Sequence, residues 1–122
     1  MPIEFVIDLV EPQKDITYVM GLSLQTLRVG DSFTHLCVYQ PPAKRNQAPK
    51  LEQKLALAVT VISIVVQGEP LENLTAESSA QIGIEGDVTA LISLLDAHKW
   101  HLKNGRYMLP HQESRIITVS GD

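Results

Sequence analysis

The chain is poor in residues that cross-link, stack or attract nucleic acid. It has one cysteine, Cys37, so no disulfide can form within the chain. Aromatic residues make up only 5% of the sequence, and we therefore expect a core of Val, Ile and Leu, which favour strands. Lys and Arg number 10 against 14 Asp and Glu, for a net charge of −4. This balance argues against binding nucleic acid through bulk positive charge and leaves only a local basic patch open.

Long hydrophobic runs and targeting signals are also lacking. The longest apolar run, residues 55–66, contains Thr60 and Ser63 and falls short of the roughly 20 residues that a membrane helix needs. The N-terminus has neither the basic region nor the small-residue cleavage site of a signal peptide. Hydrophobic residues at 44% and charged residues at 20% are typical of a folded protein. We therefore expect a soluble, cytoplasmic single domain over residues 1–122 that does not enter a membrane.

The sequence also lacks the signatures of catalysis. It has no G-x-S-x-G motif around a serine and no G-x-x-x-x-G-K-[ST] phosphate loop. Cys37 lies in an apolar stretch and has no obvious histidine partner, which favours a buried, inert thiol over a reactive one. We predict a protein that is not an enzyme and needs no cofactor.

What the sequence does contain is a series of short strand signals. Alternating or β-branched apolar stretches separated by turn residues are typical of strands. They occupy residues 4–10, 16–24, 32–39, 55–66, 79–85, 88–94, 106–109 and 115–119. The sequence shows no helix–strand alternation, no fixed-period repeat and no heptad. The predicted class is all-β, with the strands forming a closed or nearly closed antiparallel β-barrel.

Two features within these strands predict barrel geometry. The strongest strand, residues 55–66, alternates large side chains such as Leu57 and Val59 with small ones such as Ala56. We expect the small residues to pack inside a narrow barrel. Gly21 interrupts the second strand, and an isolated glycine in a strand often marks a bulge or a bend.

The connections are polar and rich in turn-forming residues. Residues 40–54 contain three prolines and indicate a long exposed loop. Residues 71–74 are predicted to form a short helical turn, and residues 96–105 a polar connection. Asp31 and Asp87 each follow a glycine, where a carboxylate accepts backbone N–H groups and fixes a turn. Acid–base chemistry by this pair is the alternative.

Six segments, taken in order, resemble the second domain of the translational GTPases, the β-barrel that follows the G domain in elongation factor Tu and its relatives. They are residues 5–10, 19–21, 27–33, 57–64, 71–86 and 102–109. The resemblance implies the barrel fold. It also implies a macromolecular partner, because the family's barrel contacts the end of aminoacyl-tRNA, ribosomal RNA or a neighbouring protein domain. It implies no GTPase activity, because the phosphate loop is lacking. Gln25-Thr26 and Glu77 or Ser78 stand where the family usually has glycine.

Two charged regions are candidate partner-binding surfaces. Lys44, Arg45 and Lys50 lie on the proline-stiffened loop and can meet RNA phosphates or an acidic protein. The alternative is a solvated surface loop. A separate acidic region suits a basic protein partner, and its candidate residues are Glu72, Glu77 and Glu85.

A cluster near residue 100 holds the candidate metal ligands. His98 and His101 are spaced to share an ion on a helical turn, with Asp96 as a third ligand and His111 further along. The favoured alternative is a polar loop in which Trp100 caps the end of the barrel.

We therefore predict a non-enzymatic binding module that acts through a macromolecular partner, with the acidic balance favouring protein over RNA. A small acidic antitoxin or immunity-type protein that neutralises a cationic toxin is a second hypothesis. A metal-dependent enzyme using His98 and His101 is a third. Open strand edges near Gln40 or at the C-terminal strand would allow a dimer.

Overall fold

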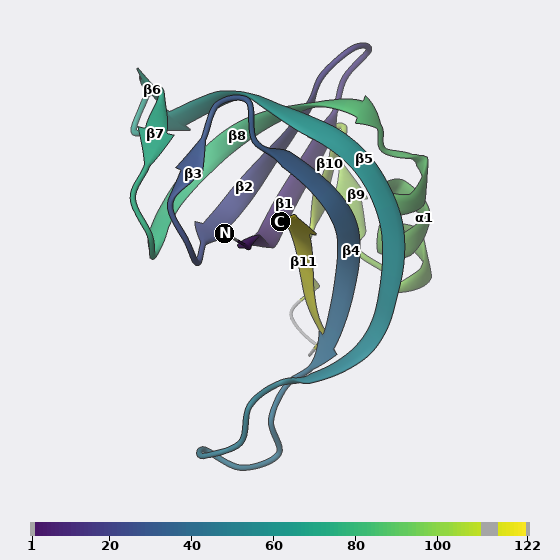
Figure 1. The fold of residues 1–122 in the computed structure, drawn as a ribbon. Helices are drawn as coiled ribbons and strands as arrows, with labels where there is room; N and C mark the ends of the chain where they lie inside the picture. Colours follow the sequence, from purple (N-terminus) through teal and green to yellow (C-terminus); the bar gives the residue numbers. More distant parts are fainter. Residues whose placement is uncertain (1, 111–114, 122) are drawn as a thin grey trace.

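The computed structural model describes residues 2–110 and 115–121 (Figure 1). Its strands are β1 (Ile3–Pro12), β2 (Thr17–Ser23), β3 (Leu27–Arg28), β4 (Ser32–Gln40), β5 (Lys50–Val66), β6 (Glu69–Leu71), β7 (Asn73–Leu74), β8 (Ser78–Asp87), β9 (His101–Lys103), β10 (Arg106–Met108) and β11 (Ile116–Gly121). The described residues contain one helix, α1 (Thr89–Ala97).

Six antiparallel strands close into a barrel within the described part of the chain. They pair in the order β11–β4–β5–β8–β2–β1, and β1 pairs back onto β11 to complete the ring. The long strands β4 and β5 curve around one side of the barrel (Figure 1). The β9–β10 hairpin extends the sheet from the second half of β1, and β3 pairs with β7 in a separate ladder. The predicted all-β class and antiparallel barrel are confirmed.

The core fills the barrel and is mostly aliphatic, as its low aromatic content predicts. Along β1, the side chains of Ile3, Phe5 and Ile7 alternate into the interior. Phe5 and Phe33 are the largest fully buried side chains. Val, Ile and Leu supply most of the remaining core, which continues without a break to Trp100. Burial of this aliphatic surface is the main favourable term in folding.

Strand β5 alternates as predicted, but the opposite face of the strand is buried. Leu57 and Val59 are buried, whereas Ala56 and Ala58 are exposed. The expectation that the small residues pack inside was therefore wrong. The interior of a small barrel has to be filled by side chains, and this requires the large residues. The first part of β5 pairs with β4 and the later part with β8, so this one strand joins two neighbours of the ring.

Gly21 lies opposite a β-bulge, which confirms the prediction that it marks an irregularity. The pairing of β1 with β2 skips Asp8 directly after the Ile7–Gly21 pair, so Asp8 is the extra residue of the bulge. A Cβ atom at Gly21 would overlap the carbonyl oxygen of Val6. The glycine therefore allows the two backbones to approach closely where the barrel wall bends.

The prediction of a strand over residues 88–94 was wrong, because this segment lies in α1 apart from its first residue. Leu91, Leu94 and Leu95 are buried. Their i, i+3, i+4 spacing is that of one helical face. The helix lies beside β5 (Figure 1). The leucine spacing was in the sequence, but the β-branched residues at its start suggested a strand.

Three connections also differ from prediction. Residues 71–74 lie largely in β6 and β7 and do not form a helical turn. Residues 96–105 include β9, whose turn to β10 uses Asn104 and Gly105, both with positive φ, as a two-residue hairpin turn requires. The loop expected over residues 40–54 spans only residues 41–49, because β5 already begins at Lys50.

The strand edges proposed for a dimer are paired within the chain. Strand β11 lies between β4 and β1, and Gln40 pairs with Lys50. In the described residues, unpaired edges belong to short strands such as β6 and β9. A dimer through the edges first proposed would have to break existing pairs.

Candidate functional site

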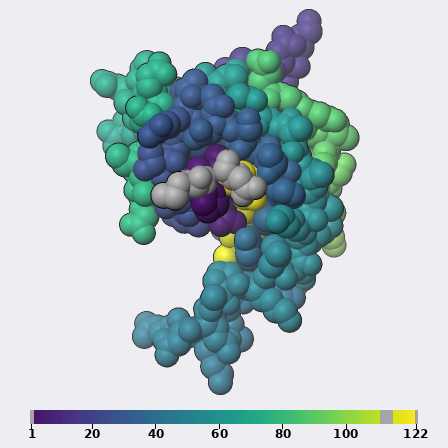
Figure 2. Space-filling model, in the orientation of Figure 1, coloured from purple at the N-terminus to yellow at the C-terminus, as the bar shows by residue number. Residues whose placement is uncertain are grey.

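The cationic loop forms the tip of an arm that projects from the barrel. We call residues 39–51 the arm: the outer ends of β4 and β5 and the loop between them. It appears as a narrow protrusion in Figure 2. Every residue of the loop is exposed, and Lys44 and Arg45 lie in it. Lys50 begins β5 at the base of the loop. None of these three side chains has a hydrogen-bond or ion-pair partner among the described residues.

The arm is tied to the barrel by a polar cluster around Glu52. The Gln40 amide nitrogen donates to Glu52 Oε1 at 3.0 Å, and Arg115 Nε lies 2.9 Å from Glu52 Oε2. These hydrogen bonds, that of Arg115 first, lower the pKa of the Glu52 carboxyl. The negative charge at the base of the arm is thus already paired. The cations nearer the tip remain available to a partner.

The acidic candidates do not form one compact surface. Glu72 lies between β6 and β7, and Glu77 lies in the turn before β8, with φ of 60°. Both fix local backbone structure, since the Glu72 carbonyl accepts from Val29 N and Glu77 N donates to Ser23 O. Glu85 lies near the other end of β8. At about 3.3 Å per residue, it is roughly 25 Å along the strand from Glu77.

Asp31 and Asp87 have the structural role predicted for them. Asp31 Oδ2 accepts from Arg28 N at 2.8 Å and closes the turn before β4. Asp87 Oδ1 accepts from Thr89 N at 2.9 Å at the start of α1. Hydrogen bonds from Thr89, its hydroxyl first and its N–H second, lower the pKa of Asp87. The second Gly-Asp pair therefore joins a strand to a helix and is not a corner between two strands.

The histidine cluster is spread over two elements. His98 follows the last residue of α1, and His101 begins β9. Within residues 2–110 and 115–121, no group of three or more His, Cys, Asp or Glu residues is arranged to hold a metal ion. His111 lies outside the described residues. Trp100 is only 5% exposed and belongs to the core cluster, in agreement with its predicted packing role.

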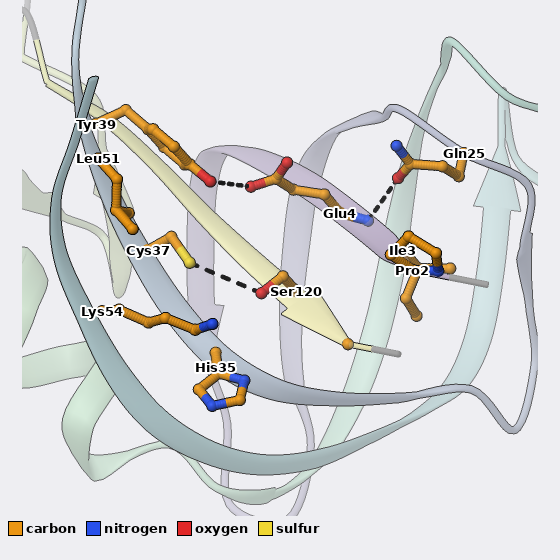
Figure 3. Close-up of a pocket in the computed structure, with 11 residues that line it drawn as sticks. Pro2, Ile3, Glu4, Gln25, His35, Cys37, Tyr39, Leu51, Lys54 and Ser120 are labelled. Carbon is orange, nitrogen blue, oxygen red and sulfur yellow. Dashed lines mark hydrogen bonds between the residues drawn. The ribbon is translucent and has the colours of Figure 1, made fainter. Parts of the chain in front are cut away.

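The structure reveals a hollow that the sequence did not indicate. It has a volume of about 310 Å³ and opens on the outer surface of β1, β4, β5 and β11, next to the base of the arm (Figure 3). Side chains from all four strands line it, together with Gln25 from the loop after β2. The polar and reactive lining residues are Glu4, Gln25, His35, Cys37, Tyr39, Lys54 and Ser120.

One carboxylate organises the upper side of this hollow. Glu4 Oε2 accepts from the Tyr39 hydroxyl at 3.0 Å and from the Thr118 hydroxyl at 2.8 Å. Glu4 N donates to Gln25 Oε1 at 2.7 Å. Burial, followed by the hydrogen bond to Glu4, raises the pKa of Tyr39 to about 12. The phenol therefore stays protonated near neutral pH and acts as a donor to Glu4.

The other side of the hollow offers hydrogen-bond donors. Cys37 is buried, as predicted, and its Sγ lies 3.7 Å from the Ser120 hydroxyl. Lys54 is the register partner of Cys37 on β5, and its ammonium group has no partner among the described residues. His35 lies two residues before Cys37 on the same face of β4. The Lys54 ammonium, the Ser120 hydroxyl and the Gln25 amide N–H groups are donors that suit an acceptor-rich group of a partner, and the Glu4 carboxylate lies in the same recess.

The sequence carried one overlooked signal for this hollow. His35, Cys37 and Tyr39 follow one another at the two-residue period that places side chains on the same face of a strand. The contributions of Glu4 and Ser120 had no local signal. They reach the site because β11 pairs with both β1 and β4 when the barrel closes.

No protein-family model matches the chain, and no curated protein is significantly similar to it in sequence. The resemblance to the second domain of translational GTPases therefore stays a prediction beyond the barrel itself. In the described residues, no helix is long and apolar enough to cross a membrane.

Proposed function

We propose that this protein is a non-enzymatic binding module that holds an acidic segment of a protein partner against the arm and the hollow at its base. The observation that supports it most is a set of four cations, on the arm and beside it, that have no partner in the part of the chain that the structure describes: Lys44, Arg45, Lys50 and Lys54. Such a local cationic surface, in a chain whose overall net charge is −4, favours an acidic partner.

Protein is favoured over RNA as the partner. Neutralisation of phosphates by a few cations gives weak binding at physiological salt, because affinity falls steeply as salt rises. The described residues of the arm also offer no aromatic side chain beyond Tyr39, whose hydroxyl is already engaged by Glu4. Single-stranded RNA is held largely by stacking on aromatic rings. The hollow instead offers separate donors suited to a carboxylate.

The family resemblance agrees with this proposal. A barrel similar to the second domain of translational GTPases would act by contact with a macromolecule and not by catalysis. On this proposal the chain is a relative of that barrel and works in the cytoplasm. A matching family in a wider set of sequences would test this part independently of the binding surface.

The binding surface can be tested by crosslinking in the cells that make the protein. A photoreactive benzoylphenylalanine placed at Asn46, at the tip of the arm, should give discrete adducts with another protein. The variant Lys44→Ala/Arg45→Ala/Lys50→Ala should lose these adducts, because the charges that recruit the partner are gone. The control variant Lys14→Ala/Lys99→Ala/Lys103→Ala removes the same number of positive charges elsewhere and should keep them.

Three results would contradict the proposal. Adducts that ribonuclease removes would assign the arm to RNA. Adducts that persist in the arm variant would show that the cations do not recruit the partner. Charge reversal at Glu72 and Glu77 that abolishes the adducts, with the arm intact, would favour the acidic side as the binding surface.

A further inference from the structure

A second, larger recess lies on a different part of the barrel surface. It is a groove of about 710 Å³ over β1, β2 and β8, with the β5–β6 turn and the end of β10 as its walls. Its lining is mainly apolar, and the chief apolar side chains are Leu9, Met20, Val65, Met108 and Leu109. It shares no lining residue with the hollow beside the arm, so the two recesses are separate sites.

Asp8 is the one charged side chain among the described residues that line the groove. The bulge in β1 places it there, since the extra residue of a bulge leaves the regular alternation of the strand. Its carboxylate has no hydrogen-bond or ion-pair partner in the described residues. The residue is exposed to solvent, and partial desolvation by the neighbouring walls raises the pKa of the Asp8 carboxyl. Asp8 thus offers an approaching cation a carboxylate without a counter-charge beside apolar walls.

We propose that this groove binds a small ligand that carries a positive charge on an apolar body. The ligand has an ammonium group that pairs with Asp8 and a hydrocarbon or aromatic body that lies along the apolar walls. Two observations support this chemistry. The walls carry large exposed apolar side chains, Met20 at 45% and Leu109 at 39%, and the one charged group among the described lining residues is negative.

The size and the side chains of the groove suit such a ligand. Ligand pockets typically have volumes of roughly 300–1,000 Å³ and a mainly apolar lining with a few polar groups that fix orientation. Met20 and Met108 are unbranched and flexible, so they can adapt to bodies of different shape. A ligand with a carboxylate in place of the ammonium group would be repelled by Asp8. The groove should therefore select ligands by the sign of their charge.

A pair of probes that differ mainly in charge tests this selection. Tryptamine carries an ammonium group on an indole, and 3-indolepropionate carries a carboxylate on the same ring system. With methyl-labelled methionine, tryptamine should shift the NMR signals of both Met20 and Met108 in a saturable manner. 3-Indolepropionate should bind at least about tenfold more weakly, the factor that corresponds to one modest charge interaction.

Variants locate the charge that is responsible. Asp8→Asn keeps the size of the side chain and removes its charge, and it should weaken tryptamine binding by about tenfold or more. It should leave the binding of 3-indolepropionate unchanged or slightly stronger. Asp15→Asn removes the same charge from the exposed turn after β1 and should leave both probes unaffected. Signals of the folded barrel in the same spectra show that each variant is intact.

Three outcomes would overturn the proposal. Equal affinity for the two probes would show that the groove does not select for a cation. Tryptamine binding that survives in Asp8→Asn would place the cation elsewhere. Shifts of Met20 and Met108 that depend on protein concentration alone would show that a second copy of the chain covers the groove.

Discussion

Two carboxylates of β1 illustrate how surroundings decide the role of a residue. Glu4 accepts hydrogen bonds from Tyr39 and Thr118, and so its negative charge is well solvated by the protein. The carboxylate of Asp8, four residues later, has no partner among the described residues and lies beside apolar side chains. The first carboxylate organises the local structure. The second remains available for a ligand.

Replacement of Asp8 should stabilise the folded protein near neutral pH. Partial desolvation by its apolar neighbours raises the pKa of Asp8 above its ordinary value of 3.8, so the folded state favours the protonated form more than the unfolded state does. That contribution is present below 3.8 and is lost as pH rises through the raised pKa. Asp8→Asn should therefore have a higher free energy of unfolding than the wild type at about pH 7, and the difference should vanish at about pH 3. Urea denaturation at the two pH values measures the free energy of unfolding of the wild type and of the variant. A variant less stable than the wild type at neutral pH would contradict the argument.

Tyr39 should make the protein sensitive to alkali. Its pKa is raised from 10.0 to about 12, so the folded chain keeps a proton that the unfolded chain loses. This contribution to stability is complete below pH 10 and disappears as pH rises through about 12. Denaturation across this window should show a steeper loss of stability in the wild type than in Tyr39→Phe. Tyr18→Phe is the control, and an unchanged slope in Tyr39→Phe would refute the assignment.

Gly21 should tolerate substitution less well than Gly30. An alanine at Gly21 would overlap the backbone carbonyl of Val6, which cannot move aside as a side chain can. We expect Gly21→Ala to cost about 3 kcal/mol, in the range of overpacking substitutions. Gly30 has φ of 101° and open space around it, so Gly30→Ala should cost only about 1 kcal/mol of backbone strain. Thermal unfolding of the two variants compares them directly.

At the scale of elements, the arm stands apart from the rest of the fold. Its loop buries no side chain, whereas the strands that carry it extend into the barrel wall. Gln40 and Lys50 are the last paired residues before the loop, and they lie opposite each other. Two residues paired in this way can be joined by a two-residue hairpin turn. The arm therefore contributes little to stability, and a loop of this length is often retained for function.

Shortening the arm should separate binding from folding. Replacement of residues 41–49 by Asn-Gly should change the free energy of unfolding by no more than about 0.5 kcal/mol, as for most surface changes. The same variant should lose the partner adducts expected under the proposed function. Chemical denaturation and crosslinking give the two readouts. A large loss of stability would show that the loop packs against the barrel after all.

At the scale of the whole molecule, closure between the first and last strands is the decisive event. Strand β11 is held between β1 and β4, and its Val119 is fully buried. Pairing between strands so far apart in sequence must await the ordering of the chain between them, because loop closure costs entropy before the contacts form. The hollow beside the arm exists only after this step.

A charge in the closing strand should therefore unfold the protein. Val119→Asp places an unpaired carboxylate inside the barrel, and we expect a loss of more than about 4 kcal/mol. Ser120→Asp, on the outward face of the same strand, should cost much less. Circular dichroism and size-exclusion chromatography distinguish the two. A folded Val119→Asp barrel would mean that β11 is not needed for closure.

The sequence by itself determined the strand-rich class, the aliphatic core, the turn role of Asp31 and the irregularity at Gly21. These follow from local rules, because side-chain alternation and turn chemistry act within a few residues. The tertiary structure alone decided which face of β5 is buried. It also decided that Glu4, Cys37 and Ser120 share one hollow and that Asp8 enters an apolar groove. These features depend on barrel closure and on a bulge, and no local pattern records which distant strands will meet.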